Sequence, residues 1–208
     1  MPVLQKIHGL LLIISGPAGT GKTTLSNRLA KTHAPKLNRV VTATTRLPRE
    51  GEVGGVDYHF LGIEEFEAKI SEGAFLEDAV VHGNRYGVLK SEVLEKMNAG
   101  LDLVISLDVQ GAAAFRGEAE RDRDMAHRLI SLFLMPVDLE TIRNRLKNRA
   151  TDNDEEINRR LVVAEGEISQ WREFDYCLVS GSKEEDFEKS KAIYRAECLR
   201  VRRLVEEQ

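Results

Sequence analysis

The sequence is poor in cysteine and has no long apolar run. Its two cysteines, Cys177 and Cys198, are too few for a disulfide framework, so we expect reduced thiols and a cytoplasmic protein. The clearest early apolar run, Leu10 to Ile14, is far shorter than the roughly 20 residues that a membrane-spanning helix needs. We therefore expect neither a disulfide-stapled protein nor a membrane protein.

The sequence also has no spacing typical of metal ligands and no strong excess of either charge. The histidines and cysteines lack the spacing of a metal centre, so we interpret them as structural or surface residues: His8, His33, His59, His82, His127, Cys177 and Cys198. The formal net charge of −4 disfavours a nucleic-acid coat protein, and we expect neither nucleic acid nor a membrane as a partner. With 208 residues, 42% hydrophobic and 31% charged, the composition is typical of one globular domain.

What the sequence does contain is an alternation of apolar runs and helical patterns. Runs that predict buried strands lie at 10–14, 101–107, 129–135 and 174–179. Helical spacing predicts a helix after 23, then helices at 63–70, 91–99, 157–171 and 186–207. Gly166, inside the 157–171 helix, costs about 1 kcal/mol relative to alanine and weakens its expected continuity. The alternation predicts an α/β fold, a parallel sheet with helices on both faces.

Two stretches interrupt this alternation. Residues 42–61 combine arginine, proline and glycine with alternating apolar positions, and they predict a small β-rich insert. Residues 138–160 are rich in charge and poor in large apolar side chains, and they predict a mobile, solvated pair of helices. We expect both to be appendages on a single core.

One motif carries chemistry by itself. GPAGTGKT, from Gly16 to Thr23, fits G-x-x-x-x-G-K-[ST] between a predicted buried strand and a predicted helix. Its glycines let backbone N–H groups converge on a phosphate at a helix N-terminus. We expect Lys22 to reach the β- and γ-phosphates and the Thr23 hydroxyl to bind Mg²⁺. The predicted ATP site comprises Gly16, Pro17, Ala18, Gly19, Thr20, Gly21, Lys22, Thr23 and Thr24.

This loop predicts an ATP- or GTP-dependent protein without choosing its class. The N-K-x-D motif with which GTPases bind guanine is missing from the sequence, and the chain is short for a motor ATPase. A small nucleoside-monophosphate kinase fits the length. Such an enzyme needs one appendage for the phosphoryl acceptor and a second that brings arginines over the phosphates.

The 42–60 segment supplies groups that an acceptor site requires. Arg46 and Arg49 lie on either side of Pro48, and two guanidinium groups can clamp one phosphate. Tyr58 and Tyr86 offer hydroxyl donors to the same phosphate. Taken alone, however, an R-x-x-R pattern is more often two solvated surface arginines, so this segment by itself leaves both interpretations open.

Together, the motifs resemble the guanylate kinase family. The family's acceptor segment, [ST]-x-T-T-R-x-P-R-x-G-E-x-x-G-x-x-Y-x-F, is matched without a gap from Thr42 to Phe60. F-L-E at 75–77, Y-G at 86–87 and D-x-Q-G at 108–111 follow at the family's spacing. The resemblance covers about Leu10 to Tyr176. It implies a phosphate-loop parallel-sheet core with a small β-rich acceptor-binding insert and a helical lid, and ATP-dependent phosphorylation of GMP and dGMP with Mg²⁺.

The resemblance also implies a role for each matching residue. The implied GMP-binding residues are Arg46, Arg49, Tyr58 and Tyr86 for the phosphate, and Glu77, Asp108 and Thr42 for guanine. A carboxylate accepts hydrogen bonds from guanine N1–H and the 2-amino group, whereas adenine would leave it unsatisfied. The implied catalytic residues are Lys22, Arg46 and three lid arginines, Arg145, Arg149 and Arg160.

The implied layout is one domain in three parts. Residues 1–41, 91–137 and 165–208 form the core, 42–90 the GMP-binding insert and 138–164 the lid. ATP and GMP are the expected partners, and the enzyme is expected to be a monomer or a homodimer.

Three positions depart from the family pattern. Val88 replaces the Ser or Thr that donates to guanine O6, which predicts GMP binding about a few-fold to tenfold weaker than is usual. Ser106 replaces the first carboxylate of a D-x-D segment, which changes the expected surroundings of Mg²⁺. Ser180 replaces an asparagine near the adenine pocket.

Two other functions fit parts of the pattern. Val88 and Ser106 keep open a kinase that acts on another small phosphorylated acceptor, such as a ribose bisphosphate. Guanylate-kinase-like domains without catalytic activity bind peptides on the same surface. Those domains generally lose the working phosphate loop, which is intact here with Lys22 and Thr23.

Overall fold

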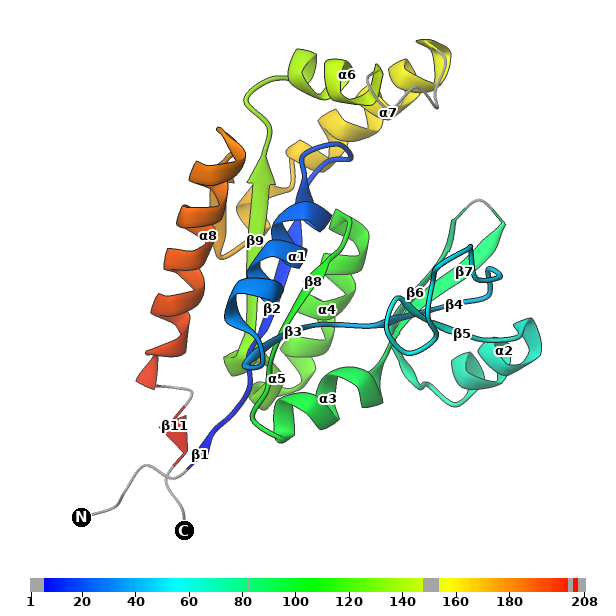
Figure 1. The fold of residues 1–208 in the computed structure, drawn as a ribbon, viewed down its shortest axis with the longest axis vertical. Helices are drawn as coiled ribbons and strands as arrows, with labels where there is room; N and C mark the ends of the chain where they lie inside the picture. Colours follow the sequence, from blue (N-terminus) through cyan, green and yellow to red (C-terminus); the bar gives the residue numbers. More distant parts are fainter. Residues whose placement is uncertain (1–5, 82, 148–153, 202–203, 206–208) are drawn as a thin grey trace.

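A five-stranded sheet forms the centre of the molecule. The computed structural model describes residues 6–81, 83–147, 154–201 and 204–205 (Figure 1). In spatial order the sheet contains β10 (Tyr176–Val179), β9 (Leu129–Met135), β2 (Leu11–Ser15), β8 (Asp102–Ser106) and β3 (Leu37–Arg39). All neighbouring strands run parallel, and helices lie in the connections between them. The expected α/β class is confirmed.

Helices cover both faces of this sheet. They are α1 (Lys22–His33), α3 (Lys90–Asn98), α4 (Val109–Arg121), α5 (Arg123–Arg128) and α8 (Lys183–Cys198). Leu11 and Ile13 share an apolar cluster with α3, α4 and α5, whereas Leu12 and Ile14 share another with α1 and α8. Because β2 is covered on both faces, all of its residues are buried, which explains the unbroken apolar run.

A second, mixed sheet projects from the core between β3 and α3. Its order is β5 (Tyr58–Phe60), β4 (Thr42–Thr44), β7 (Asn84–Leu89) and β6 (Phe75–Val81). Helix α2 (Ile63–Ser71) packs on it through Phe66, whose ring stacks on Phe75 with centroids 4.4 Å apart. We name residues 42–89 the sheet arm. The β-rich stretch expected at 42–61 is therefore part of a larger unit.

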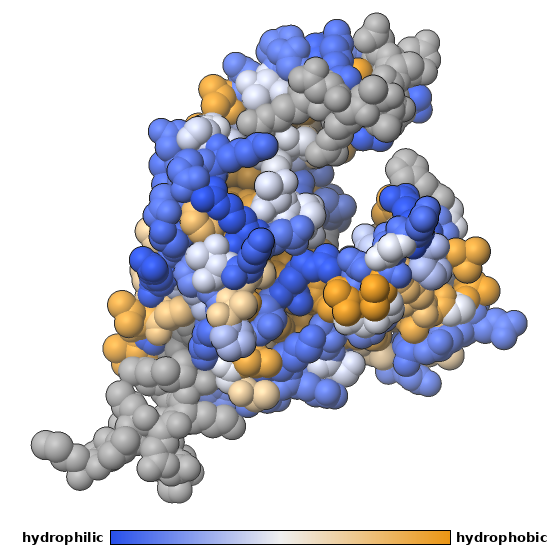
Figure 2. Space-filling view, viewed as in Figure 1, coloured by the Kyte–Doolittle hydropathy of each residue, from blue (hydrophilic) through white to orange (hydrophobic). Residues whose placement is uncertain are grey.

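Two helices project from the core after β9. They are α6 (Leu139–Lys147) and α7 (Asp154–Ile168), which we name the helical arm. The expected pair of helices is confirmed, and the pair has a small apolar interior of its own. Ile142, Ile157, Leu161 and Ala164 are buried together between the helices, because they recur at helical spacing. Figure 2 shows an open notch between the two arms.

The helical arm also ends differently from the prediction. α7 passes through Gly166 without a break and stops at Ile168. Trp171, expected within the same helix, lies in a separate 3₁₀ turn, η1 (Trp171–Glu173). The chain therefore bends between the arm and β10.

The C-terminal helix was predicted with the wrong bounds. It begins at Lys183 because Ser182 and Glu185 form a reciprocal capping box, and it ends at Cys198 rather than near 207. Beyond it, β11 (Leu204–Val205) pairs antiparallel with β1 (Lys6–Ile7). Helices α4 and α5 were not predicted at all. None of the described helices is long and apolar enough to cross a membrane.

Candidate active site

The phosphate loop joins the central strand β2 to α1. Its backbone takes conformations that favour glycine, with φ of +133° at Gly16 and +100° at Gly21. At Gly16 an added Cβ would lie 2.5 Å from the carbonyl oxygen of Leu134 on the neighbouring strand β9. The loop is therefore fitted against the sheet, and the N-terminus of α1 opens into it.

Lys22 and Thr23 lie where the motif predicts. The Lys22 ammonium donates to the carbonyl oxygens of Gly16, at 2.5 Å, and Pro17, at 2.9 Å, so its side chain folds over the loop. The Thr23 hydroxyl lies 3.4 Å from that of Ser106 at the end of β8. Hydroxyl oxygens beside a phosphate site suit Mg²⁺, which binds few protein ligands and takes others from water and substrate phosphates. These residues fit that ion.

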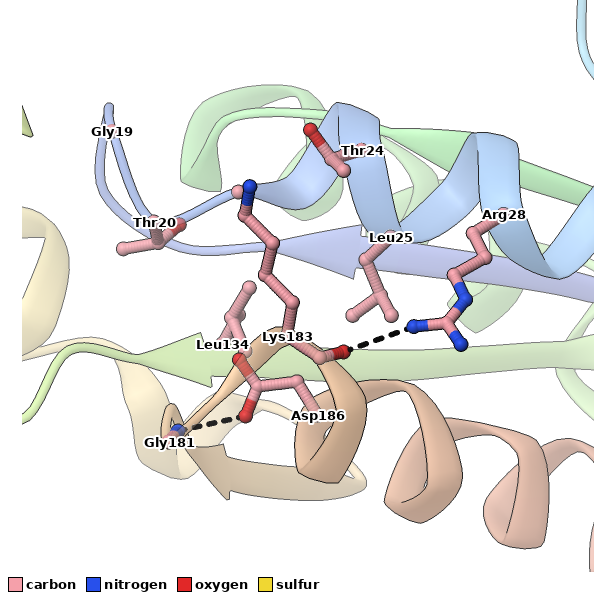
Figure 3. A pocket seen from close by; sticks show the side chains of 10 residues that line it. Gly19, Thr20, Thr24, Leu25, Arg28, Leu134, Gly181, Lys183 and Asp186 are labelled. Atoms are coloured by element: carbon pink, nitrogen blue, oxygen red, sulfur yellow. Dashed lines mark hydrogen bonds between the residues drawn. The ribbon is translucent and has the colours of Figure 1, made fainter.

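A cavity of about 370 Å³ lies beside the loop (Figure 3). The loop, α1, β9 and the start of α8 form its walls. Arg28 borders it and is held by both carboxylate oxygens of Glu184, at 2.7 and 2.9 Å. Asp186 accepts from the Ser180 hydroxyl at 2.8 Å and from the Gly181 N–H at 2.7 Å. The cavity therefore adjoins the phosphate loop directly.

The sheet arm gathers one predicted arginine with two predicted tyrosines. The Arg46 guanidinium lies 5.4 Å from the Tyr58 ring centroid, and the Tyr58 and Tyr86 rings are 6.1 Å apart. Strand register brings them together, because Thr42 pairs with Tyr58 and Thr44 with Tyr86. Thr42 is thus at the edge of the same cluster.

Glu52 belongs to this cluster, although the sequence reasoning did not single it out. Its carboxylate accepts two bonds from Arg46, at 2.8 and 3.0 Å, and one from the Arg49 backbone N–H, at 2.7 Å. The bond between Arg46 and Glu52 raises the pKa of the arginine and lowers the pKa of the glutamate. The Arg49 side chain is exposed, and its charge also lowers the pKa of Glu52. An acid placed just after the arginine pair was the available signal.

Two predicted carboxylates meet where the sheet arm joins the core. Glu77 lies on β6, and Asp108 caps α4, where Oδ1 accepts from the Gly111 N–H at 2.8 Å. Burial raises the pKa of Glu77 to about 7, and the nearby charges of Asp108 and Asp78 raise it further. Near neutral pH the Glu77 carboxyl is therefore only partly ionised.

Val88 is the cross-strand partner of Glu77. Its side chain is fully buried in the cluster that includes Leu76 and Leu107. A buried valine offers no hydrogen bond and excludes water from its neighbour, which favours the protonated form of Glu77. The departure from the family pattern thus lies beside the predicted guanine-binding carboxylate.

The predicted arginines of the helical arm are described only in part. Arg160 lies on α7 and is half-buried. The side chain of Arg145 and the whole of Arg149 lie outside the described residues, so their roles stay predictions. The described residues contain no cluster of His, Cys, Asp or Glu that could hold a metal ion.

Glu167, in the last turn of α7, is half-buried and was not predicted as a site residue. Lys22 and Asp108 are its charged neighbours. Burial raises the pKa of Glu167, Asp108 adds to this, and Lys22 and the Ala18 N–H act in the opposite direction. No local pattern marks this residue, because its partners lie far away in the sequence.

Fold and site define the class of this protein, a phosphate-loop kinase of the nucleoside-monophosphate type. The profile of the guanylate kinase family matches residues 8–197. Guanylate kinase of Maricaulis maris (strain MCS10) is 41% identical over 193 residues, or 93% of this chain and 85% of that protein. Guanylate kinase of Geobacter metallireducens is 38% identical over 202 residues, or 97% of this chain and 96% of that protein. The crystal structure of guanylate kinase from Anaplasma phagocytophilum superposes with a TM-score of 0.73 at 32% identity, covering 96% of this chain and 92% of that chain. The chain therefore belongs to the guanylate kinase family.

Proposed function

We propose that this chain transfers the γ-phosphoryl group of ATP to GMP, releasing ADP and GDP, and that dGMP is also accepted. As a member of the guanylate kinase family it is a transferase that phosphorylates GMP. The observation that best supports the proposal is a complete phosphate loop together with an arginine–glutamate–tyrosine cluster on the sheet arm.

The sheet arm is proposed to bind GMP. Its phosphate would bind Arg46, Arg49, Tyr58 and Tyr86, and its base would bind Glu77, Asp108 and Thr42. Glu52 orients the Arg46 guanidinium, since Nη2 donates to both of its carboxylate oxygens while Nη1 donates to the Leu47 carbonyl oxygen. A phosphate would then compete with these acceptors for the guanidinium N–H groups. A deprotonated Glu77 matches the N1–H and 2-amino donors of guanine, and this match supports guanine over adenine. The insert at 42–90 is the proposed unit for this step.

The phosphate loop and the helical arm are proposed to bind ATP and to stabilise the transferring group. Lys22 would leave the loop carbonyls for the β- and γ-phosphates, and the lid at 138–164 would bring Arg145, Arg149 and Arg160 over them. Residues 16–24 would hold the phosphates and the cavity beside Arg28 the nucleoside. Lid closure would exclude water, the competing acceptor.

No general base is needed, because the attacking GMP phosphate oxygen is already anionic at neutral pH. We propose that Thr23 holds Mg²⁺ together with the substrate phosphates. When bound, this ion neutralises charge on the phosphate oxygens. Ser106 replaces a carboxylate beside that position, so the protein contributes less negative charge around the ion.

A panel of acceptors tests the function. ADP release would be measured with ATP and Mg²⁺ for GMP, dGMP, AMP, UMP, ribose 5-phosphate and a ribose bisphosphate. We expect GMP to have the highest kcat/KM. If a ribose phosphate had the highest kcat/KM, the protein would still be a kinase, but its acceptor would not be GMP. A folded protein without turnover of any acceptor would favour the peptide-binding alternative.

A further inference from the structure

We propose that Glu92 is a positioning residue that braces the sheet arm against the core and so sets where bound GMP lies relative to the phosphate loop. The inference rests on the proposed function, since it takes the sheet arm as the part that binds the GMP phosphate. It concerns residues that the proposed function does not use, at the junction between the arm and the core.

The chain passes from the core to the sheet arm at Val41. The preceding residue, Val40, still belongs to the core sheet, since its backbone N–H donates to the Val104 carbonyl oxygen on β8 at 3.0 Å. The Val41 N–H instead donates to the Glu92 carboxylate at 3.1 Å, and pairing within the arm begins at Thr42. Glu92, in the first turn of α3, therefore holds the connection at the point where the two sheets separate.

The same carboxylate also contacts the arm itself. Its Oε2 lies 3.4 Å from Nε2 of His59 on β5, and Lys96, one turn further along α3, donates to Oε1. Only 9% of the Glu92 side chain is exposed. A carboxylate buried to this extent needs partners for its charge, and both Val41 and His59 lie outside α3. Glu92 thus does more than stabilise the first turn of its own helix.

A second contact ties the same strand to the core. Arg39, at the end of the outermost core strand β3, donates from Nη2 to the Val56 carbonyl oxygen at 2.7 Å and to that of Asp57 at 3.5 Å. Side chains of the core thus hold residues 56, 57 and 59, on both sides of Tyr58. Because successive side chains of a strand point to opposite faces, Tyr58 faces away from the side that carries His59. The brace therefore holds the back of the strand that presents a proposed phosphate ligand.

The arm and the core also share apolar contacts, but these do not fix a direction. Leu76 on β6 and Val88 on β7 are buried in the same cluster as Leu107 of the core. Burial of apolar surface is non-directional, so such a contact tolerates small rotations of the arm against the core. Hydrogen bonds to a carboxylate are strong and depend on angle. The contacts of Glu92 are therefore suited to fix the angle of the arm.

The phosphate ligands proposed for the arm would move as one unit. Tyr58 and Tyr86 lie on β5 and β7, which are both hydrogen-bonded to β4, and Arg46 follows β4 directly. A change in the angle of the arm would therefore leave this cluster intact but displace bound GMP relative to the phosphate loop. Phosphoryl transfer is sensitive to such displacement, because a misplacement of about 1 Å can cost about 100-fold in rate. Loss of the brace should thus lower kcat rather than raise KM for GMP.

The test compares Glu92→Ala and Glu92→Gln with the control Glu95→Ala, which changes an exposed glutamate on the same helix. We would measure kcat, KM for ATP and GMP, and thermal stability. We expect Glu92→Ala to lower kcat by about 10- to 100-fold, with both KM values within about threefold of the parent. Glu92→Gln keeps an acceptor for the Val41 N–H but loses the charge that attracts Lys96, so kcat should fall by about three- to tenfold. The control should match the parent protein.

Two further variants carry the test if Glu92→Ala does not fold. His59→Ala and Arg39→Ala each remove one contact between the arm and the core and leave Glu92 in place. We expect each to lower kcat by about three- to tenfold with KM for GMP unchanged. His59→Ala should cost less when combined with Glu92→Gln than it does alone, because the two changes weaken one contact.

A kcat for Glu92→Ala equal to that of the control would overturn the brace. So would a fall in thermal stability alone, a loss expressed only in KM for GMP, or additive losses in the double variant. Failure of the proposed function is a different result. The parent protein itself would then not phosphorylate GMP, whereas a failed brace leaves the turnover of the parent protein intact.

Discussion

The phosphate loop and the sheet arm both present cations for phosphate, but they hold those cations by different means. In the loop the backbone fixes the geometry, since Gly16 lies against β9 and Lys22 binds two loop carbonyls. In the sheet arm one side chain holds another, since Glu52 binds Arg46 on a partly exposed turn. A loop held by its backbone can be recognised from a short sequence motif. An arginine held by another side chain depends on residues that come together only when the arm folds.

The Glu52–Arg46 pair matters for the orientation of Arg46 more than for the stability of the fold. An ion pair that remains partly exposed contributes roughly 0–1 kcal/mol to folding, so the value of Glu52 lies in presenting Arg46 rather than in stabilising the arm. The loop, by contrast, cannot change without disturbing the sheet. Substitutions on the two sides should therefore give different kinetic signatures.

The largest expected effect comes from the loop. Lys22→Ala removes the cation proposed to bind the β- and γ-phosphates, and we expect kcat to fall by about 1,000-fold. GMP binding, measured by calorimetry, should remain, because its residues lie on the sheet arm. Lys31→Ala on the exposed side of α1 is the matched control. Substantial turnover in Lys22→Ala would remove the central assignment of the mechanism.

The arm-side counterpart is Glu52→Gln. Without the negative charge of the Glu52 carboxylate, Arg46 should be held less firmly in its orientation. We therefore expect KM for GMP to rise by about 10- to 100-fold, with KM for ATP unchanged. The melting temperature should hardly move, because the pair is partly exposed. Glu50→Gln, an exposed glutamate in the same turn, controls for charge. Equal effects on both substrates would show that the arm and the loop are not separable as argued.

The next prediction concerns Glu77 and the pH dependence of KM for GMP. Its raised pKa of about 7 means that the acceptor form dominates above pH 7 and is lost as pH falls. KM for GMP should therefore rise by up to about tenfold per pH unit below 7, and Glu77→Gln should abolish that slope. The free energy of unfolding of the unliganded protein depends on pH in the opposite direction. A raised pKa stabilises the fold at low pH, and this stability is lost as pH rises from the ordinary glutamate range towards 7. A flat KM profile in the parent protein would contradict the assignment.

The smallest effect concerns Val88. Val88→Ser supplies the hydroxyl that the family places near guanine O6, and KM for GMP should fall by about a few-fold. Because Val88 is fully buried, the serine also removes apolar contacts, and Val88→Thr is the companion that keeps the branched shape. If neither variant lowers KM for GMP while both remain folded, O6 is not contacted from this strand.

The parts that could be predicted from the sequence are those written in local patterns. Glycine at fixed places specified the loop, and the apolar run of β2 specified a strand covered on both faces. α4, rich in alanine and glycine, has too weak a periodicity to be predicted, and the end of α8 depends on where packing stops. Glu52 was missed because its role depends on a partner that the folded turn brings to it.

The contact between Gly16 and Leu134 has a consequence for how the enzyme is made. β2 is encoded near the start of the chain, but both of its sheet neighbours, β8 and β9, are encoded after residue 100. When the phosphate-loop motif has just left the ribosome, β9, the strand against which the loop packs, has not yet been made. The ability to bind nucleotide is therefore acquired only after both β8 and β9 have been made.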